Sequence, residues 1–299
     1  MPTVYRNRVK QVVGNGTANH KIAFTPDKRV FGCQVDLVFP SGTSYDTMAE
    51  CMTNILAIRP LVGSKNIWGD KLTGTLYRDA NLLHGTTYDF NINTGTNTVQ
   101  LTLMFAPEWF IETVQDLLAL NPKLLGAPIS LELDFTSGIA VTSTVWEFIS
   151  DDLDAPSVGF LAFEVIKPKA AGTEFVVAQP EFKSIGALLA ASIYPDSGAS
   201  NEITPVSFQV GTNKRFAHEN VSSAQNDEEL ERKGLTPAAS GRTANIYDFV
   251  PVKGDSINRA IDLAAAGQSF FTIGAASAMS GTSTIVLARL IRNADVLVA

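Results

Sequence analysis

Few of the residue types that perform chemistry in proteins occur in this chain at a spacing that would let them act together. The three histidines, His20, His84 and His218, are far apart, and none belongs to the His-x-His pair with a downstream Glu by which a cupin holds its metal. The sequence has no Gly-x-Ser-x-Gly elbow, no Walker loop and no Gly-x-Gly-x-x-Gly fingerprint. We therefore predict no enzymatic activity and no organic cofactor.

Two carboxylates, Glu132 and Asp134, are candidates for the acid and base of a glycosidase. They lie within Ile129–Phe135, where every second residue is apolar. Side chains two apart on a strand share one face, so a solvated outer face also explains the pair. We favour this structural interpretation.

Three aspartates, Asp151, Asp152 and Asp154, are candidates for oxygen ligands of a structural calcium ion. Their spacing lacks the glycine and the distal Glu of an EF-hand loop. A charged linker that ends at Pro156 is the alternative, and it is the one that we favour.

The chain carries a net charge of −7 and has a pI of about 5.0, so we predict no specific binding of nucleic acid. Locally, however, Arg6, Arg8 and Lys10 form a small basic segment near the N-terminus. This segment is either a solvated tail or a contact to an anionic surface. No apolar run reaches the roughly 18 residues of a membrane span, and Cys33 and Cys51 lie in or near apolar segments, which predicts two buried thiols in a reducing cytoplasm.

The elements that must position these residues are predominantly strands. Short alternating or β-branched runs recur, separated by Gly, Pro, Ser, Asn and Asp, as in a sandwich or barrel. The predicted strands are 29–39, 54–58, 98–105, 129–135, 142–148, 174–178, 184–194, 206–210, 244–250, 270–273 and 284–291. Along 99–105 and 129–135 the alternation predicts one core-facing side and one outer side.

Three helices are predicted between the strands, at 107–120, 227–233 and 256–266. The first begins at Pro107 and is stopped by Asn121-Pro122. For 227–233, Asn226 is the expected N-cap and Gly234 the expected terminator.

A diffuse internal repeat joins the two halves of the chain. The matched pairs are Phe105-Ala106-Pro107 with Phe249-Val250-Pro251, Gln115-Asp116-Leu117 with Ile261-Asp262-Leu263, Thr142–Val145 with Thr282–Ile285, Phe39–Gly42 with Tyr194–Gly198, and Val62–Lys65 with Val210–Lys214. They occur in the same order, at offsets between 140 and 156 residues. A period near half the chain indicates a duplicated domain, because solenoid repeats span only about 20–50 residues.

The order of these features resembles the double jelly-roll major capsid proteins of tailless, membrane-containing icosahedral bacteriophages of the corticovirus type, a lineage that includes the adenovirus hexon. The segments that carry the resemblance are Ala106-Pro107-Glu108, Leu131–Phe135, Asn226–Glu231 and Ile246–Phe249. The expected fold is therefore all-β, with two tandem eight-stranded jelly-roll barrels and short helices between strands. We expect an N-terminal basic arm at 1–18, a first barrel at 19–150, a linker at 151–160, a second barrel at 161–292 and a tail at 293–299.

The resemblance implies a homotrimeric capsomer of pseudo-hexameric outline within the virion, made in the host cytoplasm. Its partners would be neighbouring capsomers, penton or vertex proteins, minor capsid proteins and an inner viral membrane, which Arg6, Arg8 and Lys10 would face. The alternatives are a two-domain jelly-roll protein that binds or hydrolyses glycans, and a phage spike or tail fibre. The segments 41–51 and 237–242 are candidates for exposed or contact loops.

Overall fold

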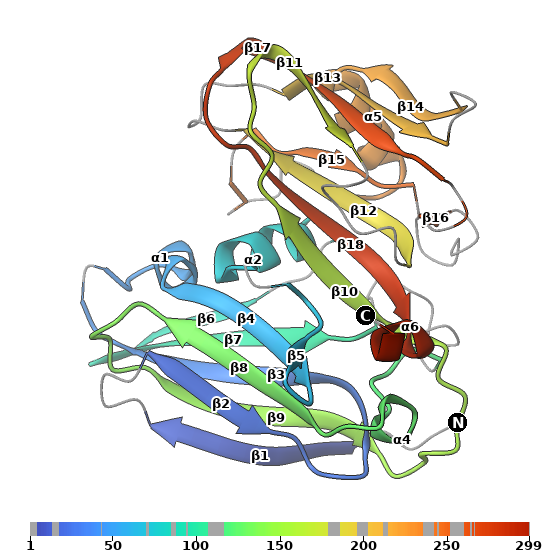
Figure 1. Cartoon of the computed structure of the whole chain (residues 1–299). Helices are drawn as coiled ribbons and strands as arrows, with labels where there is room; N and C mark the ends of the chain where they lie inside the picture. Colours follow the sequence, from blue (N-terminus) through green and yellow to red (C-terminus); the bar gives the residue numbers. More distant parts are fainter. Residues whose placement is uncertain are drawn as a thin grey trace. The chain divides into compact units, whose positions relative to one another are not determined.

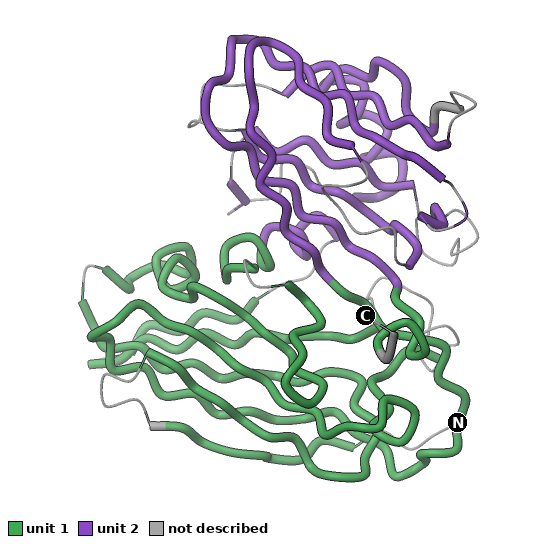
Figure 2. Tube along the Cα trace, in the orientation of Figure 1, with its two compact units in different colours: residues 1–78, 86–162, 291–299 green, residues 79–85, 163–290 purple. Residues whose placement is uncertain are grey.

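The computed structural model divides the chain into two compact units, coloured separately in Figure 2. The first unit contains residues 1–78, 86–162 and 291–299, and the second contains residues 79–85 and 163–290. The structure describes residues 5–13, 18–42, 44–69, 72–84, 88–93, 95–106, 117–178, 186–195, 203–211, 215–235, 242–243, 245–251, 260–263, 265 and 267–298.

The first unit is built from two antiparallel sheets (Figure 1). Its strands are β1 (Tyr5–Val13), β2 (Asn19–Ala23), β3 (Arg29–Pro40), β4 (Ile55–Val62), β5 (Lys65–Asn66), β6 (Asp89–Asn93), β7 (Thr96–Met104), β8 (Ile129–Phe135) and β9 (Thr142–Ser150). One sheet has the order β1-β9-β3-β7-β6 and the other has the order β2-β8-β4-β5.

The second half of the chain repeats this topology. Its strands are β10 (Gly159–Ile166), β11 (Gly172–Ala178), β12 (Ala187–Tyr194), β13 (Ile203–Val210), β14 (Arg215–Val221), β15 (Tyr247–Phe249), β16 (Ile261–Asp262), β17 (Phe270–Met279) and β18 (Thr284–Arg292). They form sheets of order β10-β18-β12-β15 and β11-β17-β13-β14, with β16 beside β12. Matched by their neighbours in the sheets, β10-β18-β12-β15 corresponds to β1-β9-β3-β7, and β11-β17-β13-β14 corresponds to β2-β8-β4-β5. Both halves are jelly rolls, so the predicted all-β double jelly-roll fold is confirmed.

The matched sequence segments that the structure describes in both halves fall on corresponding elements of the two barrels. Phe105 directly follows β7 and Phe249 ends β15, while Phe39 and Tyr194 lie at the ends of β3 and β12. The glycines after β4 and β13, Gly63 and Gly211, have φ angles of 63° and 72°. The repeat in the sequence therefore marks a repeat in three dimensions.

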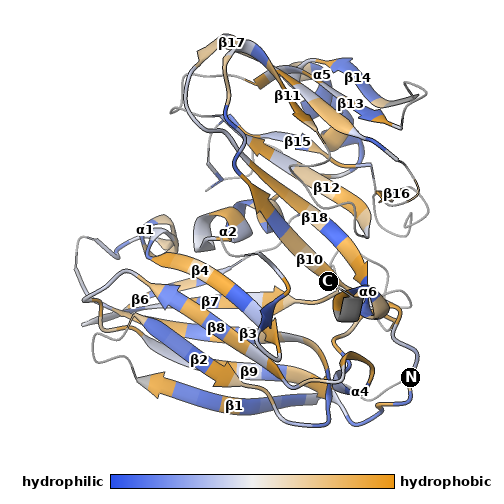
Figure 3. Cartoon of the chain, viewed as in Figure 1, coloured by the Kyte–Doolittle hydropathy of each residue, from blue (hydrophilic) through white to orange (hydrophobic). Residues whose placement is uncertain are grey.

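The alternation of polar and apolar residues along the strands determines which side chains are buried in the cores. Val99, Leu101, Leu103 and Phe105 are buried, as are Ile129, Leu131, Leu133 and Phe135, as the alternation predicts. Figure 3 shows hydrophilic and hydrophobic residues alternating along β8 and β9. In the first unit Trp68 is fully buried, and its indole N–H donates to the Leu161 carbonyl at 2.9 Å. In the second unit the rings of Phe208 and Phe271 lie 4.3 Å apart. Cys33 and Cys51 are buried free thiols, as predicted.

The helices differ in part from expectation. They are α1 (Met48–Thr53), α2 (Gly74–Leu82), α4 (Pro122–Leu125), α5 (Ser223–Arg232) and α6 (Asn293–Val298). Helix α5 begins at the N-cap Ser222, which forms a capping box with Gln225, so the expected N-cap at Asn226 is wrong. Gly234 follows its C-terminal end with φ 71°, as predicted. Among the described residues, no helix is long and apolar enough to cross a bilayer.

Two predicted helices are wrong where they can be compared. Residues 107–116 lie outside the described part of the chain, but Leu118 and Leu120 form isolated β-bridges rather than a final helical turn. Asn121 and Pro122, expected to stop a helix, instead start α4 as its N-cap and first residue. Asn is a common N-cap and Pro is common at the first helical position, so this pair of residues favours a helix start as well as a helix stop. Residues 256–259, 264 and 266 are also outside the description, and Ile261–Asp262 is strand β16.

The division into units differs from the expected domain boundaries. The expected arm at 1–18 includes β1, which pairs with β9 and belongs to the first sheet. Residues 151–160 and 291–299 are counted with the first unit, whereas Asp79–Gly85 is counted with the second. Long-range pairing of the first strand with the last strand of a barrel causes the first difference, because it draws the N-terminal segment into the sheet.

Gly63 offers a test of the repeated turn after β4 and β13. We expect Gly63→Ala to lower the free energy of unfolding of the first unit by about 1–2 kcal/mol, because a left-handed backbone is strained for an L-residue. A Cβ at this position would meet only the Ala127 side chain, at an ordinary contact distance of 3.5 Å. Urea denaturation followed by tryptophan fluorescence measures this unit, because residues 163–290 contain no Trp.

The control is Gly63→Asn, which should cost less because Asn tolerates the left-handed region. A Gly63→Ala variant as stable as the wild type would contradict the assignment of this turn.

Candidate functional site

The basic residues expected on a free arm lie on an edge strand. Arg6 and Arg8 of β1 are opposite Phe148 and Trp146 of β9, and a bulge between Arg8 and Lys10 puts Lys10 opposite Val145. All three side chains are exposed. The Arg6 guanidinium carbon is 4.8 Å from the centroid of the Trp146 ring, and Arg8 Nη2 donates to Gln11 Oε1 at 2.9 Å. The three cations therefore run along an edge of the sheet and do not form a separate tail.

These three cations have no carboxylate partner among the described residues. Many of the other cations do have one. The pairs are Lys28 with Asp151, Arg59 with Glu132 and Asp134, Lys123 with Asp154, Arg232 with Glu228, Lys233 with Glu229, Arg242 with Asp248, Arg289 with Glu164 and Arg292 with Asp295. Strand β1 therefore concentrates positive charge that no carboxylate among the described residues neutralises.

The three aspartates predicted as calcium ligands have separate partners. Asp151 accepts from the Tyr5 hydroxyl at 2.7 Å and pairs with Lys28, whose hydrogen bond lowers the pKa of this carboxyl. Asp152 Oδ1 accepts from the backbone N–H groups of Asp154 and Ala155, at 3.2 and 3.0 Å. Asp154 pairs with Lys123. The carboxylates hold a turn at the end of β9, and no group of three possible ligands occurs among the described residues. The arrangement does not fit a shared calcium site.

The carboxylates of Glu132 and Asp134 share the outer face of β8. Arg59 Nη1 is 3.2 Å from Glu132 Oε1 and also pairs with Asp134. Asn19 Nδ2 donates to both carboxylates, at 2.7 and 2.5 Å. A cross-strand ion pair on a partly exposed sheet accounts for both residues, in agreement with the structural interpretation.

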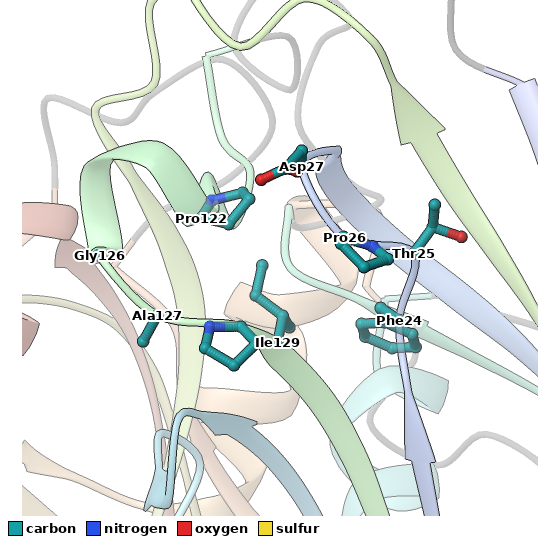
Figure 4. Close-up of a pocket in the computed structure, with 9 residues that line it drawn as sticks. Phe24, Thr25, Pro26, Asp27, Pro122, Gly126, Ala127 and Ile129 are labelled. Carbon is teal, nitrogen blue, oxygen red and sulfur yellow. The ribbon is translucent and has the colours of Figure 1, made fainter.

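A cavity of about 300 Å³ in the first unit was not anticipated from the sequence (Figure 4). The turn between β2 and β3 and the segment around α4 form it. Its lining consists of Phe24, Thr25, Pro26, Asp27, Pro122, Gly126, Ala127, Pro128 and Ile129. Three prolines and two large apolar side chains line it, and the Asp27 carboxylate is the only ionisable group among its described lining residues.

A second cavity, of about 270 Å³, lies in the second unit beside β14 and α5. Its lining is Ala217, His218, Asn226, Glu229, Lys233, Phe249, Val250, Pro251 and Ile261. The Tyr247 hydroxyl donates to the Val221 carbonyl at 3.0 Å, so His218 Nε2–H donates to the Tyr247 oxygen, 2.5 Å away. Burial lowers the pKa of His218 to about 4, which keeps the imidazole neutral near pH 7.

A buried ion pair holds part of the second unit. Of the segment 237–242, a candidate for an exposed or contact loop, residues 237–241 lie outside the described part of the chain. The side chain of Arg242 is buried and pairs with Asp248 at 3.0 Å. Asp248 also accepts from Ser192 Oγ at 2.6 Å, and the Arg242 Nε donates to the Asp79 carbonyl at 3.0 Å. Burial raises the pKa of Asp248, and the Arg242 charge opposes this effect. A buried pair with these extra hydrogen bonds is a structural element, so the Arg242 side chain is not part of an exposed surface.

Comparisons with known proteins find structural likeness only. No protein-family model and no curated protein matches the sequence. The major capsid protein P2 of Bacteriophage PM2 matches with a TM-score of 0.71 and 14% identity, over 97% of this chain and 98% of that chain. A chain of the Sulfolobus Turreted Icosahedral Virus matches with a TM-score of 0.64 and 10% identity, over 98% and 96%. The PBCV-1 virus capsid matches with a TM-score of 0.63 and 9% identity, over 96% and 93%. The chain thus has the double jelly-roll fold of viral major capsid proteins.

The neutral His218 predicts a pH dependence of stability. The unfolded chain binds a proton near pH 6.5, whereas the folded chain does so only near pH 4. The unfolded state therefore binds more protons in this window, and we expect the stability of the second unit to fall as the pH falls from about 6.5 towards 4. Burial lowers the pKa of His84 to about 3, which acts in the same direction. Hydrogen exchange of second-unit amides measures the effect.

In His218→Gln, which has no titrating ring, the decline should be shallower. Equal slopes in the wild type and the variant would contradict the assignment of His218 as the responsible group.

The separate partners of the three aspartates predict that calcium has no effect through them. We expect the melting temperature of the first unit, followed by tryptophan fluorescence, to be the same with calcium and with a chelator. An increase with calcium that disappears in Asp151→Asn/Asp154→Asn would show that these carboxylates do bind the ion.

Proposed function

We propose that this chain is a viral major capsid protein, and that three copies form a capsomer of pseudo-hexameric outline in an icosahedral shell. One observation carries the proposal: the two halves of a single chain have the same strand order, β1-β9-β3-β7 and β10-β18-β12-β15. Proteins with this double jelly-roll fold over nearly their whole length include the major capsid protein of Bacteriophage PM2.

The duplication gives a physical reason for the proposed trimer. A ring of three identical copies has threefold symmetry, but two similar barrels in each copy provide six similar lateral faces. Such a capsomer can occupy positions with nearly sixfold surroundings while every copy has the same sequence and fold. A single-barrel chain would need six copies for the same outline.

The surface is also consistent with burial by neighbours. Charged residues make up 18% of the chain, below the roughly 25% that is common in soluble globular proteins. Exposed large apolar side chains include Leu56, Ile92, Leu124, Val158 and Val176. In the proposed shell, neighbouring subunits would cover part of this surface.

The proposal extends to the location and the partners of the protein. The chain would be made in the host cytoplasm and assembled into the virion, where capsomers contact one another, vertex or penton proteins and minor capsid proteins. The part that concerns an inner viral membrane and a bacteriophage origin rests on the sequence resemblance.

Light scattering on the purified protein tests the trimer. We expect a stable species of about 96 kDa, three times the 32.1 kDa chain. Because the proposed contacts join copies of one chain, the species should form without any other protein. A monomer at all concentrations would contradict the proposed function.

A further inference from the structure

We propose that edge strand β1 of one copy docks against the acidic helix α5 of a second copy. This docking would be a contact between subunits within the capsomer. This inference rests on the proposed homotrimer and assigns one of its interfaces. It differs from the contact with an anionic membrane that the sequence alone suggested for Arg6, Arg8 and Lys10.

Strand β1 has the position and the composition of a protein-binding surface. It is an edge strand, with β9 on one side, and residues 5–13 contain three basic residues and no acidic residue. Arg6 and Arg8 lie opposite Phe148 and Trp146, whose partly exposed rings give this sheet face an apolar component. Arginine beside aromatic side chains is a typical composition of protein interfaces.

Helix α5 has the complementary charge. Its residues Ser223–Arg232 include Asp227, Glu228, Glu229 and Glu231 against the single cation Arg232, a net charge of −3 (four negative, one positive). Asn226 and Leu230 are buried, so the helix is fixed to its barrel by one face. Glu228, which pairs with Arg232 on the exposed side of the helix, and Glu231 are exposed and three residues apart, which places them side by side on the outer surface.

The spacings of the two charged rows agree. Arg6 and Arg8 are two residues apart on a strand, a rise of about 7 Å. Neighbouring positions three residues apart on a helix have Cβ atoms about 5–6 Å apart. Two arginines can therefore face two glutamates at the same time.

A second copy fits better than a lipid or nucleic-acid polyanion. Each copy carries a charge of −7, so copies repel unless complementary patches meet, and β1 supplies a positive patch without a carboxylate partner in the described part of the chain. Strand β1 also follows β9 for its whole length, from Tyr5 opposite Ile149 to Val13 opposite Thr142. The cations therefore lie along a side of the barrel. Because β1 and α5 are different surfaces of the chain, their contact is heterologous, the type of contact that a closed ring of three copies requires.

The test is a charge swap in the full-length protein. We expect Arg6→Glu/Arg8→Glu to weaken trimer formation by at least about tenfold at low salt, since close charge pairs across interfaces are typically worth more than this. Glu228→Arg/Glu231→Arg should weaken it similarly, and the variant with all four changes should recover most of the association. The difference from wild type should shrink in about 1 M salt, where charges are screened beyond about 3 Å.

The matched control is Lys167→Glu/Lys169→Glu, which makes the same change of charge at two exposed lysines elsewhere and should leave association unchanged. Tryptophan fluorescence melts identify β1 variants that do not fold, and hydrogen exchange of second-unit amides does so for the changes in α5 and at the two control lysines, because residues 163–290 contain no Trp. If reversal unfolds the first unit, Arg6→Gln/Arg8→Gln replaces it, with the same expected direction.

The outcomes separate the two proposals. A wild-type chain that stays monomeric contradicts the proposed function. A wild-type trimer that both reversals leave intact, or that the four-residue swap does not restore, overturns the β1–α5 contact and leaves the function standing. Reversal that abolishes binding to anionic vesicles or to DNA, but not trimer formation, also overturns it.

Discussion

Each half of this protein depends on pairing its first strand with its last. Tyr5 of β1 is opposite Ile149 of β9, so the pairing joins residues that are 149 − 5 = 144 positions apart. The same pairing joins β10 to β18 in the second half. Strand β9, the last strand of the first half, lies between β1 and β3 and is hydrogen-bonded along both edges. Side-chain hydrogen bonds reinforce this strand pairing. One of them runs from the Tyr5 hydroxyl to Asp151, just beyond the end of β9.

This constraint decides which parts of the fold could be predicted from the sequence. Strands with one buried face, such as β8 and β9, show alternation and were predicted to within a few residues. Both opening strands were missed. In β1 basic residues and a bulge interrupt the pattern, and β10 is almost wholly buried, so its run Phe160–Phe163 has no polar side to reveal a period of two. Their strand identity comes from partners far along the chain.

The candidate site shows the same limit. Residue types alone identified Arg6, Arg8 and Lys10 as a charged group, but only pairing with β9 showed that they lie on an edge strand. The Asp151–Asp154 cluster has ligand-type residues, yet Lys28 and Lys123, from distant segments, take two of its carboxylates. The cavities could not be predicted at all, since residues 24–27 and 122–129 meet only in the folded barrel. Arg242 ends the segment 237–242, in which Pro, Ser and Gly suggest a loop, but its side chain contacts Asp248 and Asp79.

The central claim is that two barrels of one topology exist in one chain so that three copies can form a six-barrelled unit. Cryo-electron microscopy of particles or capsomers assembled from the full-length protein tests it most directly. The account predicts a threefold-symmetric unit in which six upright barrels stand around the axis at nearly sixfold positions, with first and second barrels alternating. A map in which the chain forms monomers, or a fibre without a closed ring of barrels, would contradict it.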